Sequence, residues 1–251
     1  MTQRIALITG GSRGLGRSMA LHLAQAGADI IFTYQRNEAA AQDVAARIAG
    51  LGRRAAALQL DTGDSTSFAA FTGRIRAQLD GWGAERVDIL VNNAGAGVHA
   101  PLAEVTEAQF DSIVAMHFKA LVFLTPALLP LLNDGARILN VSSGLTRFSL
   151  PGYGLYAAAK GAVEVLTRYQ AREFAERGIT VNTLAPGAIE TDFGGGVVRD
   201  SADVNRMVAG MTALGRVGQP DDIGAAVAAL LAEGNGWMTG QRIEVSGGMV
   251  L

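Results

Sequence analysis

The chain has 251 residues, of which 49% are hydrophobic and 18% are charged, a balance typical of one large α/β domain. Its net charge of −2 argues against a nucleic-acid-binding surface, and the lack of cysteine excludes disulfides, thiolate metal sites and a cysteine nucleophile. The N-terminus carries no signal-peptide pattern, and no apolar segment looks long and clean enough to span a bilayer, so we expect a soluble cytoplasmic protein.

A glycine-rich turn follows the first predicted strand, residues 4–9, and precedes a helical pattern over 17–26. Gly10, Gly14 and Gly16 would let the backbone turn sharply and approach a diphosphate at the helix N-terminus. Their spacing departs from the common G-x-G-x-x-G motif, and the alternative is a purely structural turn. Because the turn lies between a strand and a helix, we predict that it binds a dinucleotide.

The residues after the second predicted strand, 28–33, bear on the choice of cofactor. A carboxylate there would accept hydrogen bonds from a ribose 2′-OH and favour NAD, whereas a cation would meet the 2′-phosphate of NADP. The chain has no carboxylate before Glu38 but carries Arg36, and Arg13 in the glycine turn is a second cation. We therefore predict NADP(H); the alternative is that both arginines are solvated surface residues.

The rest of the chain alternates between helical and strand patterns without a break in composition. Helices are predicted over 38–50, 64–79, 106–132, 156–177, 200–211 and 221–232, and strands over 54–60, 87–91, 136–141, 179–184 and 241–245. This alternation predicts one Rossmann-type α/β domain over 1–251, a doubly wound parallel sheet with helices on both faces. Polar and glycine-rich residues follow the strands, so they should converge on one crevice at the carboxyl edge of the sheet.

Two chemically active side chains, Tyr156 and Lys160, are separated only by alanines in the predicted helix. Residues four apart share a helix face, and a nearby ammonium would lower the pKa of the phenol and suit it to proton transfer near neutral pH. The alternative is an exposed tyrosine beside a solvated lysine. Ser143, after the fifth strand, would be a second hydroxyl donor to a carbonyl oxygen that gains charge during hydride transfer, or would serve only the local backbone.

These motifs together resemble the short-chain dehydrogenase/reductase family over essentially the whole chain, most closely 3-oxoacyl-[acyl-carrier-protein] reductases and related carbonyl reductases. The similarity is carried by Thr9-Gly10-Gly11-Ser12-Arg13-Gly14-Leu15-Gly16, Asn92-Asn93-Ala94-Gly95, Ser143, Tyr156 with Lys160, and Pro186-Gly187-Ala188-Ile189-Glu190-Thr191. The resemblance implies a sheet of seven parallel strands and often a homotetramer. It also implies that Tyr156 is the general acid in reduction, that Lys160 lowers its pKa and binds the nicotinamide ribose, and that Ser143 positions the substrate oxygen.

The same resemblance implies a set of cofactor-binding residues. Those expected at the phosphates and ribose are Gly10, Ser12, Gly14, Leu15 and Gly16, with Asp61 and Thr62 at the adenine. Asn93, Ala94 and Gly95 are expected along the nearby backbone and ribose, and Pro186, Gly187, Ile189 and Thr191 at the nicotinamide.

One position departs from the family pattern. His117 stands where the family usually has an asparagine that holds a water linking the lysine to solvent. The imidazole could take over this relay, since it can both accept and donate. Alternatively, His117 is a satisfied core histidine and the water is bound by its backbone carbonyl alone.

The substrate is less clearly indicated. Leu145, Phe148, Leu150 and Tyr153, with a substrate lid over 194–212, hint at an apolar pocket for a ketone or aldehyde; the lid helix could equally pack as ordinary core.

Acyl carrier protein is a possible partner, but residues 125–134 contain no Lys or Arg for an acidic carrier, leaving Arg147, Arg172 and Arg177 as possible contacts. We predict an NADPH-dependent carbonyl reductase. The alternatives are a 3-oxoacyl-[acyl-carrier-protein] reductase, an NAD-linked alcohol or sugar dehydrogenase, and a non-catalytic dinucleotide sensor. No metal site is predicted, because His22, His99 and His117 are isolated.

Overall fold

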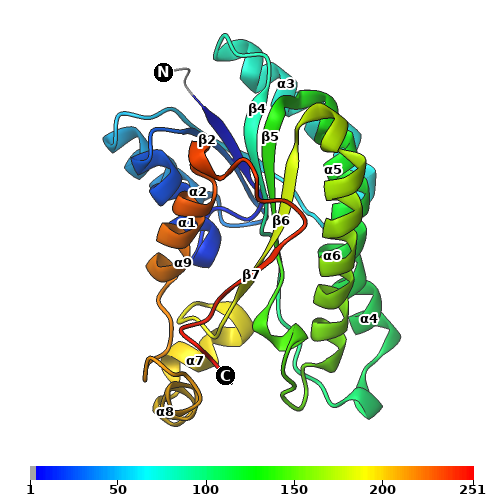
Figure 1. Cartoon of the computed structure of the whole chain (residues 1–251), viewed down its shortest axis with the longest axis vertical. Helices are drawn as coiled ribbons and strands as arrows, with labels where there is room; N and C mark the ends of the chain where they lie inside the picture. The colour runs from blue at the N-terminus through cyan, green and yellow to red at the C-terminus, as the bar shows by residue number, and fades with distance from the viewer. Residues whose placement is uncertain (1–3) are drawn as a thin grey trace.

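A seven-stranded parallel sheet forms the centre of the computed structural model, which describes residues 4–251 (Figure 1). The first three residues of the predicted domain and of the N-terminal segment lie outside the described residues. The strand order is β3-β2-β1-β4-β5-β6-β7, which confirms the predicted fold class. The strands are β1 (Ile5–Ile8), β2 (Asp29–Tyr34), β3 (Ala55–Gln59), β4 (Val87–Asn92), β5 (Leu132–Val141), β6 (Thr180–Pro186) and β7 (Arg242–Val245).

Helices cover both faces of this sheet (Figure 1). One face is covered by α1 (Gly14–Gln25), α2 (Glu38–Gly50) and α9 (Pro220–Leu230), and the other by α3 (Phe68–Gly81), α5 (Ala120–Leu128) and α6 (Gly154–Glu173). Helix α4 (Glu107–Val114) packs against α6. The strands are almost continuously apolar because both faces are buried; in β1, for example, all four residues are buried. Each face has its own hydrophobic core cluster.

The predicted helix over 106–132 contains a change of pitch. A π-helical turn, Ala115–Lys119, separates α4 from α5 and carries His117. This long helix ends at residue 131, and β5 begins at Leu132, four residues before the predicted start. Local sequence gives little warning of either feature, because a π turn is set by the tertiary position of its side chains.

The same long helix corrects one expectation. Glu107–Leu131 is long and apolar enough to cross a membrane by length and composition alone, with a mean hydropathy of 1.7 in its best window. Its inward side, including Leu121, Leu124 and Leu128, packs into the hydrophobic core against the sheet. Such a helix is weak evidence for a membrane span, and the cytoplasmic location stays a prediction.

The predicted lid lies beyond the carboxyl edge of the sheet, where α7 (Val197–Asp200) and α8 (Ala202–Gly210) sit close to the C-terminus (Figure 1). The helix predicted over 200–211 is confirmed as α8 but begins two residues later, because Ser201 is extended and caps α8 through a bond from the Val204 amide. The short helix α7 before it was not predicted. Before α7, Gly194, Gly195 and Gly196 all have positive φ, between 61° and 79°. Side chains disfavour this conformation, so the glycines allow the sharp entry to the lid. Movement of the lid stays a prediction.

Candidate functional site

A cleft of about 570 Å³ opens at the carboxyl edge of the sheet, where parallel sheets of this type bind ligands. It brings together side chains from both halves of the chain. The predicted site residues that line it are Gly10, Ser12, Arg13, Gly14, Leu15, Gly16, Thr62, Asn93, Ala94, Gly95, His117, Ser143, Tyr156, Lys160, Pro186, Gly187, Ile189 and Thr191.

The glycine turn is shaped so that no side chain fills the space beside it. Gly10 and Gly14 have positive φ, 68° and 53°, and a Cβ at Gly16 would lie 2.1 Å from the Gly10 carbonyl oxygen. Helix α1 starts at Gly14 with no acidic residue in its first turn and no side-chain cap from Arg13. Its N-terminal amides are therefore free of a protein cap and suit an anion such as a diphosphate.

Asn93 ties the end of β4 to this turn. Its Nδ2 donates to the carbonyl oxygens of Thr9 and Gly10, at 2.9 and 3.1 Å. Thr9 Oγ1 in turn accepts from the amides of Asn93 and Ala94, at 2.9 and 3.0 Å. In this geometry the Asn93 side chain supports the backbone around the glycine turn.

The two arginines expected near a 2′-phosphate lie in adjoining hollows. Arg13 lines the main cleft, whereas Arg36 and Asp61 line a second hollow; Gln35 borders both. Both guanidinium groups are exposed, and neither has a hydrogen-bond partner within residues 4–251. The Asp61 carboxylate is held by Gln35 Nε2 at 2.9 Å and by the Gly63 amide at 2.8 Å.

Ser143, Tyr156 and Lys160 meet at the centre of the cleft. Tyr156 and Lys160 are only 6% and 5% exposed, so the alternative of a solvated pair is wrong. Tyr156 shares a side-chain hydrogen bond with Ser143, and Lys160 Nζ lies 5.7 Å from the centroid of the phenol ring. Lys160 Nζ also donates to the Val141 carbonyl at 2.7 Å, which anchors the ammonium to β5.

The pKa of Tyr156 differs in direction from the sequence-based expectation. Burial raises it above its ordinary value, and the Ser143 hydrogen bond lowers it only in part. Burial also lowers the pKa of Lys160 to about 7. The phenol is therefore protonated at neutral pH, and acidification of Tyr156 by Lys160 stays a prediction.

His117 lies against Tyr156. Its ring is perpendicular to that of Tyr156, with centroids 5.3 Å apart, and Nε2 lies 2.7 Å from the Ala96 carbonyl oxygen. A hydrogen on Nε2 would satisfy this contact. Nδ1 is buried and has no hydrogen-bond partner in the described part of the chain. Burial, with Lys160 nearby, lowers the pKa of His117 to about 3, so the ring is neutral near pH 7.

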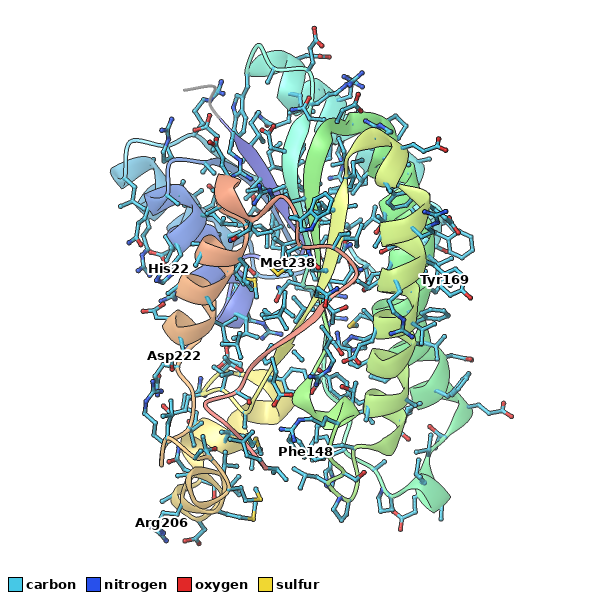
Figure 2. The ribbon with its side chains drawn as sticks, viewed as in Figure 1. His22, Phe148, Tyr169, Arg206, Asp222 and Met238 are labelled. Atoms are coloured by element: carbon cyan, nitrogen blue, oxygen red, sulfur yellow. The ribbon has the colours of Figure 1, made fainter. Side chains whose placement is uncertain are left out.

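The other end of the cleft is mainly apolar. Phe148 lies between α6 and the lid helices (Figure 2), and the cleft is also lined by Leu145, Leu150, Tyr153 and Met207, as predicted. The lining residues that were not predicted include Phe193, whose ring is 5.4 Å from that of Tyr156, and Met249. No short motif marks either position, because both reach the cleft through long-range folding.

Two arginines considered as contacts for an acidic carrier are already engaged. Arg147 forms an ion pair with Glu244, and Arg177 forms one with Asp134. Of the three candidates, only Arg172 is exposed without a hydrogen-bond or ion-pair partner among residues 4–251. In the same part of the chain, no three His, Asp or Glu side chains are grouped so as to hold a metal ion.

Comparison with known proteins identifies the family to which these features belong. A family model described as Enoyl-(Acyl carrier protein) reductase matches residues 10–250. A hydroxynaphthalene reductase-like protein, Arp2 of Metarhizium robertsii, is 34% identical over 100% of this chain and 96% of its own. The short-chain dehydrogenase/reductase FrzI of a Cladobotryum species is 36% identical over 100% and 97%. The structure of the angucycline C-6 ketoreductase LanV with bound NADP superposes with a TM-score of 0.93 at 35% identity, covering 98% of this chain and 95% of LanV.

Proposed function

The chain belongs to the short-chain dehydrogenase/reductase family, and from this we propose that it reduces an apolar ketone with NADPH, with Tyr156 as the proton donor. It is an oxidoreductase, and reduction of a carbonyl group is the reaction common to its named relatives. The observation that carries the proposal is the burial of Tyr156, Ser143 and Lys160 together at the carboxyl edge of the sheet.

The shape of the glycine turn supports a dinucleotide. A side chain at Gly16 would collide with the Gly10 carbonyl, so the close approach of α1 to the turn depends on glycine. The uncapped amides at the start of α1 would hold the diphosphate. Arg13 and Arg36 would bind the 2′-phosphate, and LanV, which is similar over nearly the whole chain, was solved with NADP. When bound, NADPH supplies the hydride.

The side chains of the protein supply the proton. As a carbonyl oxygen gains negative charge, the Ser143 hydroxyl stabilises it, and the Tyr156 hydroxyl donates its proton. Burial keeps Tyr156 in its protonated form until that charge develops. Lys160, held by the Val141 carbonyl, would stabilise the phenolate left behind. His117 packs on Tyr156 and restricts the orientation of the phenol.

The apolar end of the cleft favours a ring ketone rather than a carrier-bound thioester. Aromatic and aliphatic side chains line it, and one relative is named for hydroxynaphthalene reduction and a similar structure for an angucycline C-6 ketoreductase. Arg147 and Arg177, two of the three possible contacts for an acidic carrier, are already held in ion pairs.

The test is a panel of ketones and aldehydes with NADPH, followed by loss of nicotinamide absorbance. Tyr156→Phe should bind NADPH normally and lose about 10²–10⁴-fold in kcat, because it removes the proton donor. Tyr169→Phe is the matched control, since Tyr169 lies on the outer face of the same helix (Figure 2) and is 64% exposed. Normal turnover by Tyr156→Phe would disprove the assigned role.

We also propose that the chain assembles as a homotetramer. The outer faces of α5 and α6 expose Phe123, Val165 and Tyr169, which are 55%, 46% and 64% exposed and would be covered by a second copy of the chain. Light scattering on the purified protein tests this; a monomeric mass would contradict it.

A further inference from the structure

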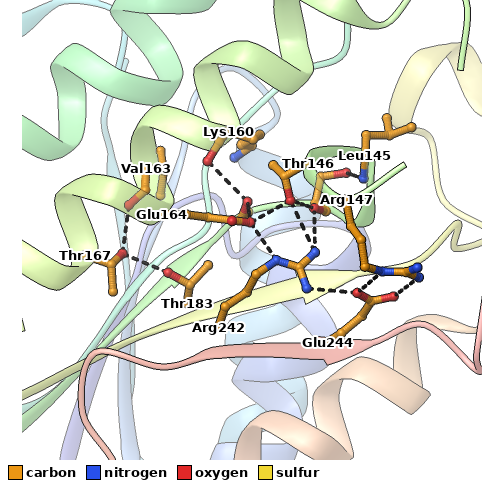
Figure 3. Close-up of polar contacts among 12 residues, drawn as sticks. Leu145, Thr146, Arg147, Lys160, Val163, Glu164, Thr167, Thr183, Arg242 and Glu244 are labelled. Carbon is orange, nitrogen blue, oxygen red and sulfur yellow. Dashed lines mark hydrogen bonds and ion pairs between the residues drawn. The ribbon is translucent and has the colours of Figure 1, made fainter. Parts of the chain in front are cut away.

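An alternating chain of arginine and glutamate side chains lies beside the catalytic residues (Figure 3). Arg242 on β7 donates from Nε to Glu164 on α6 at 2.9 Å and from Nη1 to Glu244 at 2.8 Å. Arg147, which follows the turn at Ser143, donates to the Glu244 carboxylate from Nε at 2.9 Å and from Nη2 at 2.8 Å. None of these four side chains takes part in the proton transfer proposed above, so their arrangement calls for another role.

The inner end of this chain holds the turn that carries Ser143. Glu164 Oε1 accepts from Ser142 Oγ at 2.8 Å and from Thr146 Oγ1 at 2.7 Å. Arg242 Nη2 donates to Thr146 Oγ1 at 3.2 Å and lies 3.4 Å from the Ser143 carbonyl oxygen. These contacts fix both ends of the turn, and with it the direction of the Ser143 hydroxyl.

The outer end holds the last residues of the protein. Arg147 donates from Nη1 to the Val250 carbonyl at 2.6 Å and from Nη2 to the Met249 carbonyl at 2.5 Å. Val250 has a φ of 52°, a conformation that is unfavourable for a β-branched residue and persists only where its surroundings impose it. We call Arg147 with its two partners, Met249 and Val250, the C-terminal latch.

The latched residues are joined to the lid. The Val250 amide donates to the Met211 carbonyl at 2.8 Å, and the Leu214 amide donates to the Gly247 carbonyl at 3.1 Å, immediately after α8. The Met249 side chain is 2% exposed, packs with Val208 of α8, and lines the cleft. The C-terminal segment is therefore both a wall of the cleft and an anchor for the lid.

We propose that Arg147 is a positioning residue for substrate binding: through the C-terminal latch, it holds Met249 and the end of the lid against a bulky ketone, in fixed relation to Ser143. The nature of the bound ketone rests on the proposed function, but the latch itself does not. Arg147 does not line the cleft, so its removal should act on binding rather than on the chemical step.

The energetics favour a local effect. The Arg147 and Glu244 side chains are 36% and 19% exposed, so solvent screens the pair and its contribution to global stability is small. The bonds from Arg147 lower the pKa of Glu244 to about 2, which keeps the pair ionised at assay pH. Loss of Arg147 should leave the protein folded and free the C-terminal segment.

The first test is amide hydrogen exchange on the full chain, because it needs no substrate. In Arg147→Met, we expect the amides of Val250 and Leu214 to exchange about tenfold faster or more than in the wild type. Arg172→Met removes the same charge from an exposed site without partners among residues 4–251 and should change neither rate. Equal protection in Arg147→Met and wild type would overturn the proposal.

The second test separates positioning from general damage. With α-tetralone, Arg147→Met should raise KM by about five- to twentyfold and change kcat by less than about twofold, while KM for the smaller cyclohexanone stays nearly unchanged. The KM of Arg147→Lys for α-tetralone should lie between the values of wild type and Arg147→Met, because an ammonium cannot reach both Glu244 and the Met249 and Val250 carbonyls at once. Equal increases in KM for both ketones, or a fall in kcat alone, would overturn it.

The two proposals fail separately. If wild-type protein reduces no ketone with NADPH, the proposed function fails, and hydrogen exchange still decides whether Arg147 holds the C-terminal segment.

Discussion

Gly95 must be glycine because of its neighbour His117, and this makes Gly95→Ala an informative substitution. A Cβ at Gly95 would lie 2.5 Å from His117 Cε1 and 3.1 Å from Nδ1. Carbon atoms in contact are normally about 3.5–4.0 Å apart, so the ring would have to move by about 1 Å. The ring is 1% exposed, faces Tyr156 and is held by the Ala96 carbonyl, so it has little room to do so.

The expected cost follows from these contacts. Overpacking of a buried site costs about 1–3 kcal/mol, and loss of the bond to Ala96 adds about 0.5–1.5 kcal/mol. We therefore expect Gly95→Ala to lower the free energy of unfolding by about 1.5–4.5 kcal/mol. It should also lower kcat, because the displaced ring presses on Tyr156. Urea unfolding and steady-state kinetics measure the two effects.

A double-mutant cycle with His117→Ala isolates the clash. Once the imidazole is gone, Gly95→Ala should be nearly neutral, or stabilising by up to about 1 kcal/mol, because alanine restricts the unfolded chain. Gly161→Ala is the control, since a Cβ there meets nothing within 4 Å. If Gly95→Ala costs the same in both backgrounds, the collision with His117 is not its cause, and the reasoning fails.

Three further predictions concern the cofactor, the lysine and the histidine. Replacing both Arg13 and Arg36 by Ala should lower the ratio of kcat/KM for NADPH to kcat/KM for NADH by about 10–100-fold, because each substitution removes a bond to the charged 2′-phosphate. An unchanged ratio would contradict the NADP(H) preference. The pKa of Lys160 is about 7 in the folded protein, against an ordinary value of 10.5. Between pH 7 and pH 10.5 the unfolded chain therefore binds more protons than the folded protein, so the free energy of unfolding should rise from pH 7 to pH 9. Lys160→Met should reduce this rise by up to about 2.7 kcal/mol in urea unfolding, and an unaltered slope would show that the lysine titrates normally when folded. His117, with a pKa of about 3, stays neutral over pH 6–9. His117→Ala should therefore lower kcat about two- to tenfold, through loss of the ring that packs on Tyr156, without shifting the pH profile of kcat. A shifted profile would support the proton relay instead.

The sequence was most informative where local patterns decide the structure. The helix predicted over 38–50 has those bounds in the structure, because Asn37 caps it and a regular apolar spacing follows. The crevice was predictable because Gly10–Gly16, Asn93, Ser143 and Gly187 each follow a strand, and parallel strands end at one edge.

Features set by distant residues were not predictable. Arg147 and Glu244 are separated by 97 positions, and nothing near either residue indicates the other. Phe193 and Met249 enter the cleft only because the lid and the C-terminal segment fold over it. Spacing reveals the cation beside Tyr156 but not the extent of burial, which raises the pKa of the phenol; acidification by Lys160 stays a prediction.

The π turn at Ala115–Lys119 inserts an additional residue into an otherwise regular α-helical repeat. Ile113, His117, Leu121 and Leu124 have the spacing of one helix face, and all four are buried. Turns of this kind are frequent at functional sites. Here the widened turn carries the histidine whose ring packs edge-on against Tyr156, so a change of helical pitch coincides with the wall of the cleft.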